Sequence, residues 1–153
     1  MSEKLKVGDK APDFHAQDQD GVERKLDDYS GKWLVVYFYP KDHTPGCIRE
    51  ACGMRDNYGD IKKLAEIVGV SGDSVKSHAG FAAKYELPFT LLADPEKNIL
   101  DSYGTNGILL NKRSTFIIDP EGKIARIYEK VNPDAHAAQI IADLEELRGE
   151  KVG

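Results

Sequence analysis

The chain has 153 residues, of which 41% are hydrophobic, and this size and composition fit one globular domain with its own core. With 26 acidic against 21 basic residues and a formal net charge of -5, the sequence has no basic stripe for phosphates, which argues against nucleic acid as a partner. No repeat, linker or low-complexity stretch divides it, so we expect a single domain over residues 1–153.

The apolar segments are too short for export or for a membrane. The first residues, MSEKLKVGDK, contain no hydrophobic stretch of signal-peptide length. The longest apolar run, Trp33–Tyr39, has seven residues, whereas a membrane-spanning helix needs about 20. We therefore expect a cytoplasmic protein with no membrane partner. In that reducing compartment, a pair of cysteines such as Cys47 and Cys52 is more often catalytic or metal-binding than structural.

The first predicted element is a short hairpin. Residues 13–17 and 22–26 lie on either side of Asp20-Gly21, a dipeptide typical of tight turns. The next element, Trp33–Tyr39, is a continuous run of aromatic and β-branched residues that stops at Pro40. Such a run predicts a central strand buried on both of its faces.

Helices and strands alternate after this strand. The residue pattern predicts helices over 45–65 and 74–86, and short apolar strands over 67–70 and 89–92. A strand, a helix and a second strand form a parallel βαβ unit. The second helix is expected to have one apolar side, which consists of Val75, Ala79, Ala82 and Ala83.

Two strands and a helix complete the chain. Residues 115–118 and 124–128 are joined by the turn sequence DPEG, which is short enough to make the strands antiparallel. In the last helix, Asn132 is the expected N-cap and Pro133 the first helical residue. Its apolar face is expected to carry Ala137, Ile140, Ile141, Leu144 and Leu147. Together these elements predict an α/β fold with a mixed central sheet flanked by helices.

The segment that ends at Cys47 follows the carboxyl end of the first buried strand, where open parallel sheets place their sites. Thr44 and Pro45 have the form of an N-cap and a first helical residue, which puts Cys47 in the first helical turn beside unpaired backbone N–H groups. The helix dipole there stabilises a thiolate, so we expect an ionised Cys47 near neutral pH. Gly46 removes a side chain next to the sulfur, as expected where a substrate approaches the backbone closely.

Cys52 lies five positions after Cys47. In an intact α-helix, two residues with this spacing have Cα atoms roughly 8–9 Å apart and lie on different faces. A disulfide needs a Cα separation below about 7 Å. Either the two cysteines never bond, or the start of the helix must unwind before they do.

Pro40, Thr44 and Cys47 form the pattern P-x-x-x-T-x-x-C, which resembles the active-site signature of the peroxiredoxins, thiol peroxidases with a thioredoxin-like fold. The longer string FYPKDHTPGC, followed by EAC, is similar to the bacterioferritin comigratory protein or peroxiredoxin Q subfamily. The similarity extends from GDKAPDF near the N-terminus to the last helix, although Ile48 stands where a small hydroxyl residue is expected. It implies a thioredoxin-like fold with an N-terminal hairpin extension.

The resemblance also implies roles for individual residues. Cys47 is expected to be the peroxidatic cysteine and Cys52 the resolving one, and Arg113 matches the arginine that the family places beside the sulfur. Glu50 is expected to orient that arginine. The hydroxyl of Thr44 is expected to hydrogen-bond the sulfur or the substrate, and Pro40 and Gly46 to support the site.

The reaction cycle implied by the resemblance has three steps. A hydroperoxide oxidises the Cys47 thiolate to sulfenic acid, Cys52 condenses with it to a disulfide, and an external dithiol protein, thioredoxin or glutaredoxin, reduces that bond. No cofactor and no metal are required, because sulfur itself carries the two electrons. A monomer or a weak homodimer is expected.

Three other functions are compatible with a pair of cysteines. A thioredoxin-type disulfide oxidoreductase uses C-x-x-C, but here four residues separate the cysteines. A metal-binding module would join Cys47 and Cys52 to a histidine, but the second ligand pair usual for zinc is missing from the sequence. A redox-regulated holdase is the third. His43 is the histidine nearest the cysteines and is interpreted as a loop residue, and the remaining three are expected at the surface: His15, His78 and His136.

Overall fold

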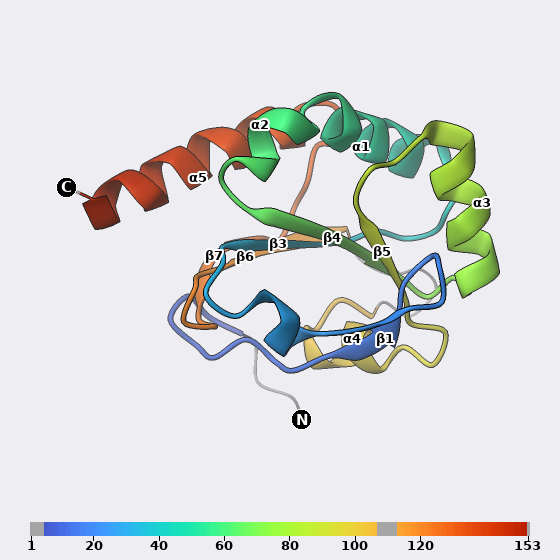
Figure 1. The fold of residues 1–153 in the computed structure, drawn as a ribbon, viewed down its shortest axis with the longest axis horizontal. Coiled ribbons are helices and arrows are strands. Elements are labelled where there is room, and N and C mark those ends of the chain that lie inside the picture. The colour runs from blue at the N-terminus through green and yellow to red at the C-terminus, as the bar shows by residue number, and fades with distance from the viewer. Residues whose placement is uncertain (1–4, 107–112, 153) are drawn as a thin grey trace.

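The computed structural model describes residues 5–106 and 113–152. These residues form two sheets: a two-stranded hairpin and a five-stranded sheet with the order β5-β4-β3-β6-β7 (Figure 1). The elements in chain order are β1 (His15–Gln17), β2 (Glu23–Lys25), the 3-10 helix η1 (Leu26–Tyr29), β3 (Leu34–Phe38), α1 (Pro45–Asp56), α2 (Tyr58–Lys62), β4 (Glu66–Ser71), α3 (Val75–Tyr85), β5 (Thr90–Ala93), α4 (Asn98–Ser102), β6 (Ser114–Ile118), β7 (Ile124–Tyr128) and α5 (His136–Val152).

The five-stranded sheet is mixed, as predicted. β3 lies at its centre, parallel to β4 and antiparallel to β6. β4 is parallel to β5, and β6 is antiparallel to β7. Every residue of β3 is buried, because an unbroken apolar strand can satisfy both of its faces only inside the protein. The predicted N-terminal hairpin is also confirmed, with β1 antiparallel to β2.

Two hydrophobic clusters cover the two faces of the sheet. Alternate residues of β3 contribute to each: Val35 and Tyr37 to one, and Val36 and Phe38 to the other. The first cluster includes buried residues of α1, α2, α3 and α5, while the second includes residues of α4 and of the N-terminal segment. Figure 1 shows α1, α2 and α5 above the sheet, and α4 and β1 below it.

Two of the helix predictions need correction. The helix expected over 45–65 is two helices separated at Asn57, whose side-chain amide and backbone N–H both donate to the Gly53 carbonyl, at 2.8 Å and 3.2 Å, and so cap the end of the first helix. The last helix begins at His136, because the side chain of Asn132 accepts from the backbone N–H of Asp134 at 3.0 Å and stabilises a turn first. Helix α4 was not predicted.

The buried face of α3 also differs from the prediction. His78 and Phe81 are the buried residues of this helix, whereas Ala79 and Ala83 are exposed. Alanine fits either environment, so a pattern of alanines is a weak guide to the buried face. The apolar face predicted for α5 is confirmed at Ala137, Ile140 and Leu144, which are buried, while Ile141 and Leu147 pack partly against them.

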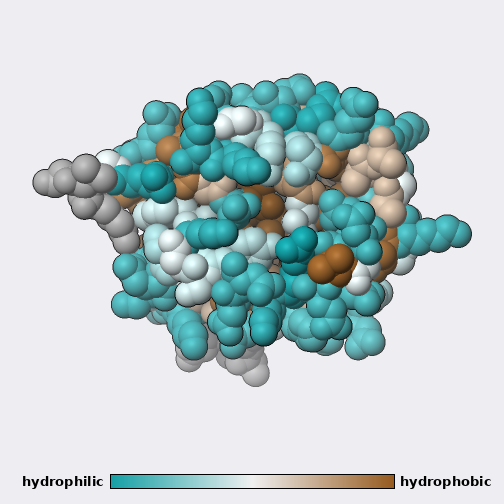
Figure 2. All heavy atoms as spheres, in the orientation of Figure 1, coloured by the Kyte–Doolittle hydropathy of each residue, from teal (hydrophilic) through white to brown (hydrophobic). Residues whose placement is uncertain are grey.

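The surface seen in the orientation of Figure 1 is mostly hydrophilic, and hydrophobic residues occupy only small areas of it (Figure 2). In the described part of the chain, Val7 and Val22 are the exposed large hydrophobic residues. Across residues 5–106 and 113–152, no helix combines the length and the apolar character needed to span a bilayer.

Candidate active site

Cys47 lies in the first turn of α1, just after the loop that follows β3. Thr44 has the extended backbone of an N-cap and Pro45 is the first helical residue, as predicted. The backbone N–H of Ile48 donates to the Thr44 carbonyl at 2.8 Å, which closes the first helical turn around Cys47. The Cys47 residue is only 1% exposed. The sequence therefore places the thiol at a helix N-terminus and largely removes it from bulk solvent.

The side chain of Thr44 does not cap the helix. Its hydroxyl donates to the backbone carbonyl of Lys41 at 2.9 Å, within the same loop. A hydroxyl has one proton, so while this bond exists Thr44 can only accept a hydrogen bond from another group. The predicted donation from Thr44 to the sulfur or to a substrate would require its hydroxyl to rotate.

Arg113 contacts Cys47 although the two residues are 66 positions apart in the sequence. Strand β6 begins at Ser114, which pairs with Phe38, so Arg113 lies at the carboxyl end of β3. Its Nη2 donates to Cys47 Sγ at 3.4 Å, and its Nη1 donates to Glu50 Oε1 at 2.6 Å. Burial opposes the charge of the guanidinium, but attraction by Glu50 and Cys47 outweighs it and raises the pKa of Arg113. The sulfur thus has a permanent cation beside it.

Glu50 lies one helical turn after Cys47 and is 1% exposed. Its Oε1 accepts from Arg113, but its Oε2 has no hydrogen-bond partner among the described residues. Burial disfavours the carboxylate more than Arg113 favours it, and it raises the pKa of Glu50 to about 7. Glu50 therefore lies where it can orient Arg113, and its charge changes near neutral pH.

Gly46 makes room for the guanidinium. A Cβ atom at this position would lie 2.9 Å from Nη2 of Arg113, closer than such contacts normally come. The sequence suggested that a substrate approaches the backbone here, whereas in the structure it is Arg113 that does so. Any side chain at Gly46 would push this group away from Cys47.

Cys52 is half-buried and belongs to the same helix as Cys47. Both thiols are free, and α1 runs unbroken from Pro45 to Asp56. This is the arrangement in which the two Cα atoms are too far apart for a disulfide. Arg49 and Arg55, the other arginines of α1, pair with carboxylates elsewhere, at Asp134 and Asp56.

Two of the histidine predictions are wrong. His78 and His136 were expected at the surface but are 0% and 1% exposed. Nε2 of His78 lies 2.9 Å from the Leu92 carbonyl, and Nε2 of His136 lies 2.7 Å from the Thr115 hydroxyl. Burial lowers the pKa of His136. Sequence alone gives no signal for such histidines, because their partners lie on distant strands.

Within the described part of the chain, one group of three side chains is close enough to hold a metal ion: Asp42, Asp73 and His78. It contains neither cysteine, so it is not the cysteine-based metal site considered from the sequence. Asp42 and His78 are hydrogen-bonded to each other, and the backbone N–H of Asp42 donates to Asp73 at 2.8 Å.

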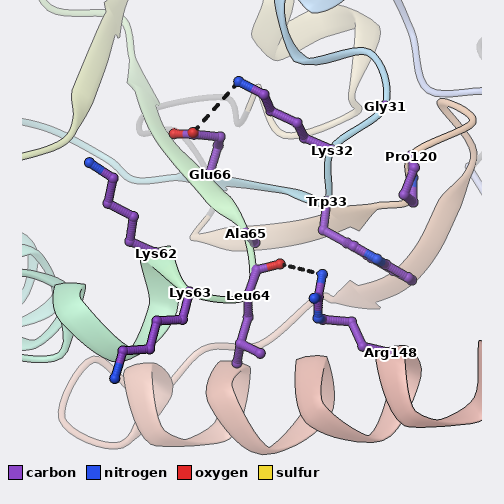
Figure 3. Close-up of a pocket in the computed structure, with 10 residues that line it drawn as sticks. All are labelled: Gly31, Lys32, Trp33, Lys62, Lys63, Leu64, Ala65, Glu66, Pro120 and Arg148. Atoms are coloured by element: carbon purple, nitrogen blue, oxygen red, sulfur yellow. Dashed lines mark hydrogen bonds and ion pairs between the residues drawn. The ribbon is translucent and has the colours of Figure 1, made fainter. Parts of the chain in front are cut away.

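A polar pocket of about 300 Å³ lies at the opposite end of the strands (Figure 3). It is lined by residues that lead into β3 and β4, including Trp33 and Glu66, whereas Cys47 follows the end of β3. Lys62 and Lys63 point away from each other at its edge (Figure 3). None of the predicted site residues lines this pocket.

The fold and the cysteine–arginine contact are those expected of a thiol peroxidase with a thioredoxin-like fold. Residues 7–127 match the AhpC/TSA family, and the chain belongs to this family. It is 42% identical over 152 residues to a putative peroxiredoxin bcp of Coxiella burnetii, in an alignment that covers 92% of this chain and 99% of the relative.

Solved structures of peroxiredoxins agree with this assignment. Peroxidoxin BcpB from Mycobacterium tuberculosis superposes with a TM-score of 0.87 at 34% identity, covering 94% of this chain and 99% of that one. The bacterioferritin comigratory protein of Xanthomonas campestris superposes with a TM-score of 0.82 at 33% identity, covering 87% and 90%. The similarity to the bacterioferritin comigratory protein and peroxiredoxin Q group, inferred from the sequence, is confirmed.

Proposed function

We propose that this thiol-dependent peroxidase reduces hydrogen peroxide and organic hydroperoxides through Cys47. The observation that carries the proposal is the 3.4 Å contact between Arg113 Nη2 and Cys47 Sγ in the first turn of α1. The Xanthomonas campestris relative is described by its alkyl peroxide reduction activity, which supports organic hydroperoxides as a substrate class.

In the first step the Cys47 thiolate attacks the terminal oxygen of ROOH. The S–O bond forms as the O–O bond breaks, so that Cys47 becomes a sulfenic acid and RO⁻ leaves, taking a proton from water to give ROH. Sulfur loses two electrons and the peroxide gains them. Arg113 lies where its N–H groups stabilise both the thiolate and the negative charge that develops on the leaving oxygen.

In the second step the thiol of Cys52 attacks the sulfenic sulfur of Cys47. A disulfide forms and water leaves. Since both residues belong to one continuous helix, the start of α1 must unwind before the sulfurs meet. An external dithiol protein then reduces the disulfide by exchange and is itself oxidised.

The finer assignments rest on the sequence and remain proposals. They are thioredoxin or glutaredoxin as the reductant, the cytoplasm as the location, a monomer or weak homodimer as the assembly, and one domain over residues 1–153. The supporting roles of Thr44, Pro40 and Gly46 belong with them.

Peroxide consumption by the purified protein with a thioredoxin system tests the proposal. We expect Cys47→Ser to abolish consumption, because the attacking sulfur is lost. We expect Cys52→Ser to be oxidised once, without thioredoxin-driven turnover, because its sulfenic acid has no internal partner. Full activity of Cys47→Ser would contradict the assignment of Cys47.

A further inference from the structure

The loop between β3 and α1 is fastened by a buried polar cluster that the proposed peroxidase chemistry does not use. Asp42, in this loop, places Oδ2 at 2.7 Å from Nδ1 of His78 in α3. The side chains of His78 and Asp42 are 0% and 1% exposed. A buried polar pair whose hydrogen bonds are satisfied is rigid, so it fixes the loop relative to α3.

The geometry indicates that His78 carries a proton on both ring nitrogens. Nε2 lies 2.9 Å from the Leu92 carbonyl oxygen, which can only accept, so Nε2 is a donor. Nδ1 faces the Asp42 carboxylate, which also accepts a hydrogen bond from the hydroxyl of Tyr39 at 2.7 Å and from that of Ser77 at 2.8 Å. The two hydroxyl donors favour the ionised form of this carboxyl group, and an ionised carboxylate can only accept, so Nδ1 is a donor as well. The pair is therefore an imidazolium and a carboxylate.

The same loop contains a residue in an unfavourable backbone conformation. His43, between Asp42 and the N-cap Thr44, has φ of 65°, which side-chain-bearing residues rarely adopt. Its ring lies 5.1 Å from that of Phe81 in α3. Such a conformation persists only where neighbouring contacts hold it. Asp42 and His43 thus join the end of the loop to α3 at two successive residues.

We propose that the buried Asp42–His78 ion pair positions the loop before α1 so that Cys47 meets Arg113, and that it stays in place as the fixed end when α1 unwinds. This inference rests on the proposed function and adds two positioning residues to it. Asp42 lies two residues before the N-cap, so the anchor ends where the helix begins. The ion pair therefore favours the folded first turn of α1, although neither of its residues belongs to α1.

The two halves of the reaction should respond in opposite ways when the anchor is weakened. Attack on peroxide needs Cys47 in place beside Arg113, and a misplacement of about 1 Å can cost roughly 100-fold in rate. Disulfide formation requires Cys47 to leave its position beside Arg113. A weaker anchor should therefore slow the first step but not the second, whereas general damage to the fold would slow both.

The variant His78→Gln tests this in rapid-mixing experiments with one equivalent of hydrogen peroxide and no reductant. Sulfenic acid formation is followed in the Cys52→Ser background, and disulfide formation with both cysteines present, by quenching, thiol blocking and intact mass. We expect His78→Gln to slow the first step by roughly 10-fold to 100-fold. We expect disulfide formation from the sulfenic acid to be at least as fast as in the unmodified protein.

The exposed pair His15–Glu23 provides the matched control. It has the same 2.7 Å separation between a ring nitrogen and a carboxylate oxygen, but both side chains are 64% exposed. His15→Gln should leave both rates unchanged. An unchanged first step in His78→Gln, or an equal slowing of both steps, would refute the anchor. If hydrogen peroxide did not oxidise Cys47 in the unmodified protein, that result would instead refute the proposed function.

Ser77→Ala keeps the test decisive if His78→Gln does not fold. It removes one donor to Asp42 and leaves both charges paired. We expect a smaller slowing of the first step alone, and no change in either rate would count against the proposal. Nitrogen NMR of His78 at neutral pH gives an independent readout: two protonated ring nitrogens are expected, and one bare nitrogen would exclude the ion pair.

Discussion

Arg113 donates hydrogen bonds to two acceptors, which compete for its positive charge. One nitrogen faces Cys47 Sγ at 3.4 Å and the other faces Glu50 Oε1 at 2.6 Å. When Glu50 is ionised, its carboxylate and the Cys47 sulfur share one cation, and when Glu50 is protonated the charge of Arg113 is available to the sulfur. Because burial raises the pKa of Glu50 to about 7, this sharing changes near neutral pH.

The buried Glu50 predicts a specific pH dependence of stability. Its pKa is 4.5 in an ordinary environment and about 7 here, so between these values the unfolded chain has released a proton that the folded protein retains. The free energy of unfolding therefore falls as pH rises from about 4.5 to 7, and this contribution is constant outside that window. The loss amounts to about 3 kcal/mol, at 1.36 kcal/mol for each pKa unit.

Urea unfolding of the parent protein and of Glu50→Gln over this pH range measures the effect. The glutamine has no proton to lose, so the stability of the variant relative to the parent should rise by about 3 kcal/mol between pH 4.5 and 7. Glu145→Gln, at an exposed position of α5, controls for the removal of one negative charge. A constant difference between parent and Glu50→Gln would show that folding does not raise the pKa of Glu50.

At the scale of the element, α1 has to satisfy two opposed requirements. In the proposed cycle it is folded at its first turn to hold Cys47 near Arg113, and it opens to bring Cys47 to Cys52. We expect residues between the two cysteines to leave the helix in such an opening. Their helix propensity therefore contributes directly to the free energy of the step.

Arg49 allows that contribution to be isolated. It is exposed and forms an ion pair with Asp134 at 2.9 Å. Arg49→Ala removes the ion pair but keeps a strong helix former, whereas Arg49→Gly also lowers the stability of the helix by about 1 kcal/mol. We expect disulfide formation to be about five times faster in Arg49→Gly than in Arg49→Ala. Equal rates in the two variants, measured after stoichiometric oxidation, would mean that unwinding of this segment does not limit the step.

At the scale of the whole molecule, the parts that the sequence predicts are those specified by neighbouring residues. The apolar run of β3, the Asp20-Gly21 turn and the Thr44-Pro45 helix start are all local patterns, and each is found where expected. The sequence also locates Cys47 and Cys52 on one helix. Such signals act over a few residues and need no knowledge of the fold.

The parts that escape prediction depend on contacts between distant residues. Arg113 lies 66 positions from Cys47 and was found only through resemblance to a family. His78 is buried because Asp42, 36 positions away, neutralises it. A histidine or an aspartate is usually exposed, so composition predicts the wrong environment until its partner is known.

The packing of side chains over neighbouring strands of the sheet can be tested at Gly69 in β4, which pairs with Tyr37 in β3. A Cβ atom there would lie 2.8 Å from the ring of Tyr37, which is itself stacked on Tyr39 with centroids 5.4 Å apart. Because the ring is buried and cannot move freely, Gly69→Ala should destabilise the protein by about 1–3 kcal/mol. Gly80→Ala in α3, where a Cβ meets nothing within 4 Å, should stabilise it by about 1 kcal/mol. Thermal or urea unfolding that showed Gly69→Ala to be as stable as the parent protein would show that Tyr37 is not packed tightly against β4.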